Sequence, residues 1–206
     1  LMSREDAERD ERKTEGRPFN NTLPTPNYSL MPRMEDYLGG RKLSFQRARL
    51  NLWYPSNEAV DSAPRVVVPA SATAPNIYWQ ARAMDDNPKR WMSPGAPRGD
   101  AIVIVWPDLP RVTRGLVVVE GPMDALAAAG CDYIGVALMG GVPAQAIERL
   151  RMMFSNYPVT IVVDRDDPAL MLGAAMALIE AGFLVRIREP YPAKDLAALG
   201  PDERKG

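Results

Sequence analysis

The 206-residue sequence contains no histidine and a single cysteine, Cys131. These absences exclude, within this chain, a zinc site built from cysteines and histidines, a catalytic pair of serine or cysteine with histidine, and a disulfide framework. Any catalysis must therefore use carboxylates, lysines, arginines and bound ions.

Long hydrophobic segments are also missing. The longest apolar run, residues 168–179, is shorter than the roughly 20 residues that cross a bilayer, and its alanines and methionines predict a buried helix. The charged N-terminus has no features of a signal peptide. We therefore expect no membrane partner and a reducing, cytoplasmic setting.

The net charge of −1 conceals an uneven distribution. Residues 41–119 hold 11 lysines and arginines against 6 acidic residues, whereas residues 120–206 hold 8 against 12. A basic segment before an acidic one is the distribution expected of a polyanion-binding surface beside a metal site. Ordinary solvated surfaces would give the same counts, so charge alone leaves both interpretations open.

Composition and hydrophobic pattern divide the chain into three segments. Residues 1–30 are charged and then rich in proline and asparagine, which predicts a flexible arm or linker. Residues 31–112 combine a short helical pattern with β-like runs at 65–69, 77–83 and 101–106. This middle segment is predicted to form a smaller α+β subdomain with an antiparallel or mixed sheet.

Residues 113–206 alternate apolar strands with helical patterns. Strands are expected at 116–119, 133–138, 159–163 and 183–187, with helices between them. Continuous apolar strands alternating with helices are typical of a parallel sheet covered on both faces. We therefore expect an α/β fold with a parallel four-stranded sheet and flanking helices. Ligands of such sheets bind beyond the carboxyl ends of the strands.

Acidic residues follow two of these strands. Glu120 ends the first, with Asp124 in the first turn of the next helix, and Asp164 and Asp166 end the third. An ionised carboxylate is costly in a core unless it is paired, so acids gathered at one sheet edge predict a shared cation. Mg²⁺ prefers such oxygen ligands.

The order and spacing of these acids resemble the Toprim domain, the fold shared by topoisomerases, bacterial-type primases and some nucleases. Glu120 matches the acid of the E-G-x-x-D motif, and Asp164 and Asp166 match the D-x-D motif. The resemblance implies catalytic roles for these three residues. It also implies Mg²⁺ or Mn²⁺ as cofactor, with the ligands Glu120, Asp124, Asp164, Asp166 and Asp195.

The upstream segment resembles DnaG-like bacterial-type and phage primases. The runs RVVVPA (65–70), YWQARA (78–83) and PKRWMSPG (88–95) are similar to a strand ending in proline, a strand carrying an arginine, and a K-Y-L-N-P turn. Trp79 and Trp91 are candidates for base stacking, although single tryptophans are more often core residues. The resemblance implies nucleotide or template contacts by Arg82, Lys89, Arg90 and Lys194.

The function implied by the resemblance is that of a DNA primase catalytic core. Such a nucleotidyltransferase joins ribonucleoside triphosphates into short RNA primers on a single-stranded DNA template. Because one cysteine cannot support a zinc-binding module, a separate zinc-binding module and a replicative helicase are expected as partners. The expected location is the cytoplasm of a bacterial cell, and the sequence leaves a phage, plasmid or cellular source open.

Three alternatives remain open. A Toprim nuclease would use the same cations with water as the nucleophile. A non-catalytic nucleic-acid-binding replication module is the second, favoured by Ala197, which stands where the family often has a second acid. In the third alternative, the acidic cluster is only a solvated loop edge. A topoisomerase is disfavoured, because it needs a nucleophilic tyrosine on a further domain.

Overall fold

The computed structural model describes residues 22–58, 62–70, 78–94, 98–109, 113–163, 168–189 and 196–199. The first elements are η1 (Tyr28–Leu30), α2 (Met31–Gly40), α3 (Phe45–Leu50), β1 (Tyr54–Ser56), β2 (Arg65–Ala70), β3 (Tyr78–Ala83), β4 (Trp91–Met92) and β5 (Val103–Val105). They are followed by β6 (Leu116–Val119), α4 (Pro122–Ala129), β7 (Ile134–Ala137), α5 (Ala144–Phe154), β8 (Val159–Val162), α6 (Pro168–Glu180), β9 (Val185–Arg188) and η3 (Leu196–Ala198).

The first sheet is antiparallel throughout, in the order β1-β2-β3-β4. Successive side chains of a strand point to opposite faces. In β3, Trp79 and Ala81 pack into a small core on one face, whereas Gln80 and Arg82 lie on the other. The alternation along one strand therefore separates structural residues from residues that are available to a ligand.

The second sheet has the order β5-β7-β6-β8-β9. Strands β6, β7, β8 and β9 are parallel, as predicted, but β5 pairs antiparallel with β7, so this sheet is mixed and has five strands. The prediction that residues 101–106 belong to the first sheet is wrong. Val103 and Val105 are buried in the core shared with α4, and β5 covers the edge of β7 that would otherwise be exposed.

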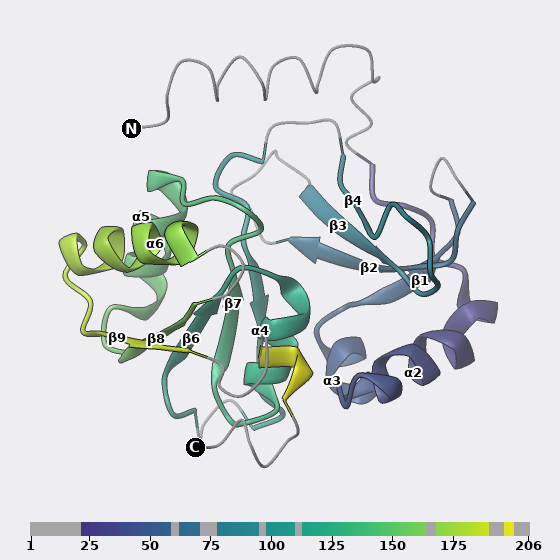
Figure 1. The fold of residues 1–206 in the computed structure, drawn as a ribbon, viewed down its shortest axis with the longest axis horizontal. Coiled ribbons are helices and arrows are strands. Elements are labelled where there is room, and N and C mark those ends of the chain that lie inside the picture. The colour runs from purple at the N-terminus through teal and green to yellow at the C-terminus, as the bar shows by residue number, and fades with distance from the viewer. Residues whose placement is uncertain are drawn as a thin grey trace.

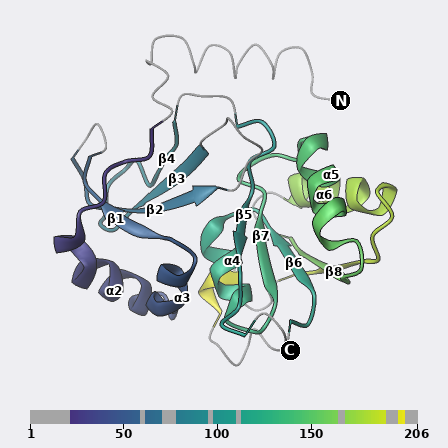
Figure 2. The same cartoon turned by 180° about the vertical axis from the view of Figure 1, so that it is seen from behind.

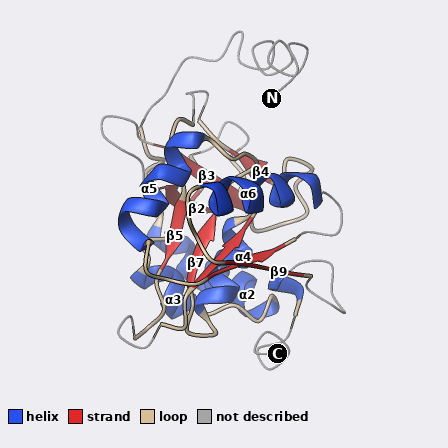
Figure 3. Cartoon of the chain, turned by 90° about the vertical axis from the view of Figure 1, so that its left-hand side faces the viewer, coloured by secondary structure: helices blue, strands red, loops and turns tan. Residues whose placement is uncertain are grey.

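Helices cover both faces of the second sheet (Figures 1 and 2). Helices α5 and α6 lie over one face, in front of the strands in Figure 3, and share a core with it. Helix α4 covers the other face, and a second core runs without interruption from α4 to α2, α3 and the first sheet. Helix α4 therefore lies between the two sheets. The expected domain limits, 31–112 and 113–206, stay a prediction.

The position of α4 depends on a close approach to β7. Gly121 caps the helix in an extended conformation and Pro122 begins it, which is a favourable start for a helix. A Cβ atom at Gly135 of β7 would collide with the backbone of Ala125, whose Cα would be only 2.8 Å away. Because only glycine fits, Gly135 fixes the distance of α4 from the sheet and thereby places Asp124.

Helix α6 is less buried than its sequence predicts. Met171, Ala174, Ala175 and Leu178 face the core, but Leu172, Met176 and Ile179 are 45%, 59% and 50% exposed. The prediction of a buried helix is therefore only half right, because the sheet and α5 cover one side of α6 alone. None of the helices in the described ranges combines the length and the hydropathy that a membrane-spanning segment needs.

Residues 22–29, which we name the N-terminal strap, run beside β1 and β3. They belong to the segment expected to be a flexible arm; residues 1–21 of that segment lie outside the described residues. Side chains of the first sheet donate hydrogen bonds to strap carbonyls. These bonds are Trp79 Nε1 to Thr22 at 3.1 Å, the Tyr54 hydroxyl to Pro24 at 2.8 Å and the Ser56 hydroxyl to Thr25 at 2.8 Å.

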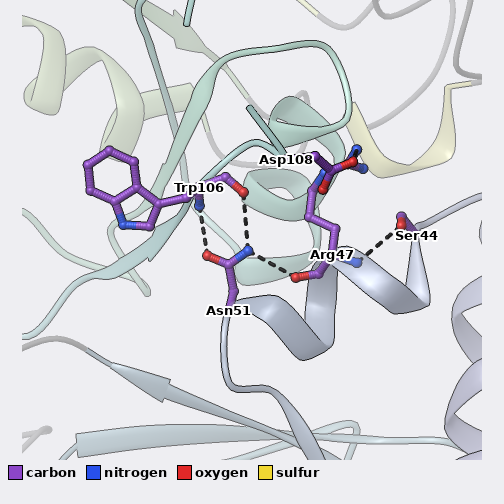
Figure 4. A network of polar contacts seen from close by, with 5 residues as sticks. All are labelled: Ser44, Arg47, Asn51, Trp106 and Asp108. Carbon is purple, nitrogen blue, oxygen red and sulfur yellow. Dashed lines mark hydrogen bonds and ion pairs between the residues drawn. The ribbon is translucent and has the colours of Figure 1, made fainter. Parts of the chain in front are cut away.

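A polar joint connects α3 to the segment that follows β5 (Figure 4). The Asn51 amide donates to the Trp106 carbonyl at 3.1 Å and accepts from the Trp106 N–H at 2.7 Å. Arg47 forms an ion pair with Asp108 at 2.6 Å. Because Trp106 and Asp108 follow a strand of the second sheet, the joint fixes that sheet relative to α3.

Candidate functional site

A pocket of about 480 Å³ is lined by residues of both sheets. One wall comes from the first sheet and the end of α2, and the other from the carboxyl ends of β6 and β7 together with α4 and η3. The pocket therefore occupies the edge where a parallel sheet usually binds its ligands.

The first wall is basic. Arg82 and Gln80 come from the same face of β3, Arg90 and Trp91 from the β3–β4 turn and β4, and Arg41 from the C-cap of α2. Arg82 is anchored twice. Its Nε donates to the Tyr37 hydroxyl at 3.1 Å, and its guanidinium carbon lies 5.2 Å from the centre of the Trp91 ring. A cation stacked on an aromatic face is held in orientation, so Arg82 is prepared to receive an anion.

The turn that carries Arg90 is held by hydrogen bonds from the side chain of Arg65. This β2 side chain is only 1% exposed. Its Nη1 donates to the Lys89 carbonyl at 2.9 Å and to the Ala81 carbonyl at 3.4 Å. The Ala83 N–H also donates to the Arg90 carbonyl at 2.9 Å. The buried guanidinium therefore positions the backbone on which Arg90 stands.

The second wall is acidic. Glu120 directly follows β6, and Asp124 lies in the first turn of α4, where the helix dipole favours a negative charge. Asp124 Oδ1 accepts the N–H of Ala197 at 2.7 Å. This contact ties η3, which begins one residue after Asp195 in the sequence, to the pocket.

Four of the predicted site residues line the pocket, namely Arg82, Arg90, Glu120 and Asp124. Lys89 is exposed on its turn and is not among the lining residues. Trp91 lines the pocket, whereas Trp79 is buried on the far face of β3. The other predicted site residues lie outside the described residues; they are Asp164, Asp166, Lys194 and Asp195.

The chemistry of the described acids suits a hard divalent cation. Glu120 and Asp124 present carboxylate oxygens to one pocket, and Mg²⁺ is often held by one or two carboxylates together with substrate phosphates. Within the described ranges, no three residues of the types His, Cys, Asp and Glu form a group that could hold a metal. The metal cluster predicted from the sequence therefore stays a prediction.

Several pocket residues were missed by the sequence analysis. Arg41, Gln80 and Met139 line the cavity, and Tyr37 and Arg65 position its arginines. The signal for Gln80 was available, because it shares the period-2 face of β3 with Arg82. Arg41 had no comparable signal, since only the packing of α2 against the first sheet brings it to the pocket.

Comparisons with known proteins identify the fold. No protein-family model matches the sequence, and no curated protein matches it. The structure is similar to that of the DnaG catalytic core, with 15% identity and a TM-score of 0.57 over 93% of this chain and 72% of that chain. It is also similar to the Aquifex aeolicus primase, zinc-binding and RNA polymerase domains, with 17% identity and a TM-score of 0.46 over 98% of this chain and 52% of that chain. The similarity to the DnaG catalytic core shows that the described residues have a primase-like fold, and the pocket is its candidate site.

Proposed function

We propose that the chain is the catalytic core of a DNA primase and joins ribonucleoside triphosphates on a single-stranded DNA template. The observation that carries the proposal is the pocket, in which an arginine wall faces a carboxylate wall within a primase-like fold. Its volume of about 480 Å³ lies in the range of small-molecule sites.

The arginine wall suits a polyphosphate. Guanidinium groups form paired, charge-assisted hydrogen bonds with phosphate oxygens. Arg82 and Arg90 are proposed to bind the triphosphate or the template backbone, with Arg41 as a third cation. Trp91 offers an aromatic face to a base, although Arg82 already occupies part of that face.

The carboxylate wall suits the metal and the reacting hydroxyl. In the proposal, Glu120, Asp124, Asp164, Asp166 and Asp195 hold Mg²⁺ or Mn²⁺. When bound, such a cation neutralises phosphate charge and favours in-line displacement. The primer 3′-hydroxyl oxygen bonds to the α-phosphorus, pyrophosphate leaves, and Glu120 accepts the hydroxyl proton. Asp124 also orients the turn at Ala197.

The same proposal includes the expected partners. A replicative helicase and a separate zinc-binding module would supply unwinding and start-site selection, and the protein would act in the cytoplasm of a bacterial cell.

A primer-extension assay tests the proposal without requiring start-site selection. An RNA primer annealed to a DNA template is incubated with the protein, Mg²⁺ and ribonucleoside triphosphates. We expect metal-dependent extension that falls about 100-fold or more in Glu120→Gln, the usual range for loss of a general base. The double substitution Asp164→Ala with Asp166→Ala is expected to abolish it. Glu180→Gln, at the exposed end of α6, is the matched control and should be fully active.

Two outcomes would overturn the proposal. The first is extension that survives Glu120→Gln and the double aspartate substitution. The second is the absence of extension by a folded protein with either Mg²⁺ or Mn²⁺. Degradation of the nucleic acid without added nucleotides would instead support the nuclease alternative.

A further inference from the structure

The loop that follows β7, Leu138–Gly141, forms the rim of the pocket beside Glu120. Met139 and Gly140 both line the cavity, and both have left-handed backbones, with φ angles of 55° and 83°. A non-glycine residue rarely adopts this conformation, so surrounding contacts must hold Met139 in it.

Arg98 supplies those contacts. Its Nη1 donates to the carbonyls of Leu138 at 2.7 Å and Met139 at 2.8 Å. The same guanidinium lies against Gly141. A Cβ atom there would overlap Nη2 and would lie 3.1 Å from the guanidinium carbon. Arg98 therefore contacts three of the four loop residues, Leu138, Met139 and Gly141, and the absence of a side chain at Gly141 makes room for its guanidinium.

The loop is in turn bonded to the backbone of the acidic wall. The Met139 N–H donates to the Glu120 carbonyl at 2.8 Å, and the Leu138 N–H donates to the Val119 carbonyl at 3.0 Å. These bonds extend the pairing of β6 and β7 past the ends of both strands. A path of hydrogen bonds thus runs from Arg98 through the Met139 peptide to the backbone of Glu120.

We propose that Arg98 is a positioning residue, which fixes the Leu138–Gly141 loop and through it the alignment of Glu120 with the substrate. This inference rests on the proposed function, because the substrate is the one proposed above. Arg98 is not among the residues that line the pocket. On the opposite wall, Arg82 contacts Tyr37 and Trp91, and the turn of Arg90 is bonded to Arg65. The loss of Arg98 should therefore impair the reaction step more than nucleotide binding.

The first test follows the backbone and needs no enzymatic activity. Amide hydrogen exchange is measured on the protein alone for wild type, Arg98→Ala, Arg98→Lys and the control Arg151→Ala, an exposed arginine on α5 paired with Glu148. In Arg98→Ala the Met139 amide, which bonds to Glu120, should exchange about tenfold faster or more, while the amides of β8 are unchanged. Arg98→Lys should retain part of the wild-type protection of the Met139 amide. The control Arg151→Ala should retain all of it.

The second test separates binding from reaction. In the primer-extension assay, Arg98→Ala should lower kcat about tenfold or more with KM for the nucleotide within about twofold of wild type, as expected for a small misalignment of a reacting group. Arg98→Lys should recover part of kcat. If Arg98→Ala does not fold, Gly141→Ala is used, because its methyl group displaces the guanidinium and should give the same pattern.

Unchanged exchange at Met139, or a rise in KM with kcat unaltered, would overturn the role of Arg98. If the wild-type protein extends no primer, the proposed function is refuted. The alignment of Glu120 with that substrate by Arg98 is then refuted with it. The exchange measurement would still show whether Arg98 holds the loop, so the two failures are distinguishable.

Discussion

Arg82 has the most defined environment of the cations in the pocket. Its Nε is bonded to Tyr37 and its guanidinium stacks on Trp91. These contacts use one nitrogen and one face of the group. The remaining donors are oriented by a rigid support, which reduces the conformational entropy lost when an anion binds.

Substitution of Arg82 should weaken nucleotide binding. In Arg82→Ala we expect KM for ribonucleoside triphosphates to rise about tenfold or more, because a charge-assisted hydrogen bond of about 1.5–3 kcal/mol is lost. Arg114→Ala is a matched control, since Arg114 also stacks on a ring, that of Tyr133, but lies at the amino end of β6. Equal effects of the two substitutions on KM would contradict the assignment.

Gly135 is required by the close approach of α4 to β7. Gly135→Ala should lower the free energy of unfolding by about 1–3 kcal/mol, because α4 must move away from β7 to admit the methyl group. Urea titration measures this change. Gly173→Ala on α6 is the control: its Cβ would meet nothing within 4 Å, and the helix should gain up to about 1 kcal/mol. Similar losses at both glycines would refute the close-packing account.

At the scale of elements, the N-terminal strap is joined to the first sheet through Tyr54. The Tyr54 hydroxyl donates to the Pro24 carbonyl at 2.8 Å. Partial burial, reinforced by the negative charge of Glu58 and by Tyr28, raises the pKa of Tyr54 from 10.0 to about 12. The folded state therefore favours the neutral hydroxyl that makes this bond.

Because the pKa of Tyr54 is raised, the free energy of unfolding should fall at alkaline pH. An unfolded chain ionises this tyrosine near its ordinary pKa of 10.0, whereas the folded chain ionises it near 12. The contribution of Tyr54 to the free energy of unfolding is thus complete below pH 10 and is lost as the pH rises through 12. Tyr54→Phe should be less stable than wild type at about pH 9, by about 1 kcal/mol for the lost hydrogen bond, and should lose less stability on going to about pH 11.5.

Urea unfolding at both pH values checks this prediction, with Tyr157→Phe on the other side of the molecule as the control. The same loss of stability between the two pH values in Tyr54→Phe and wild type would contradict it.

The elements that the sequence predicted best are those with local patterns. The order β6, α4, β7, α5, β8, α6, β9 followed from apolar strands and from caps such as Gly121 with Pro122. Non-local pairing was harder to predict. The sequence around Val103 and Val105 predicted a strand but did not indicate that β7 was its partner. Leu172 and Met176 of α6 were predicted to be buried, because hydropathy does not show which side of a helix its neighbours cover.

The candidate site was predictable to a similar extent. Glu120 was found from its place at a strand end and Asp124 from its place in the first turn of the next helix. Arg82 and Arg90 were found from the primase resemblance, and all four line the pocket. Arg98 gave no signal, because its partners are the backbone carbonyls of Leu138 and Met139, which any sequence would provide.

At the scale of the whole molecule, the pocket depends on how the two sheets are held together. A continuous core joins them through α4, and the polar joint between α3 and the segment after β5 adds directional contacts. The arginines and the carboxylates stand on opposite sides of this junction. Their separation is therefore set by contacts remote from the pocket.

Loss of the joint should disturb both stability and binding. Asn51→Ala removes both hydrogen bonds to Trp106 and should lower the free energy of unfolding by about 1–3 kcal/mol. It should also weaken the binding of a ribonucleoside triphosphate with Mg²⁺, measured by calorimetry. Asn57→Ala, which removes one exposed bond to Asn27, is the control and should change neither. Unaltered nucleotide affinity in a destabilised Asn51→Ala would show that the joint does not set the pocket.

The most direct measurement of the central claim is a crystal structure of the protein soaked with Mn²⁺ and a ribonucleoside triphosphate. We predict an anomalous Mn²⁺ peak bonded to the Glu120 carboxylate, with the triphosphate between that carboxylate and the guanidinium groups of Arg82 and Arg90. A pocket that contains neither the metal nor the nucleotide at saturating concentrations, or a nucleotide bound elsewhere on the molecule, would contradict the account.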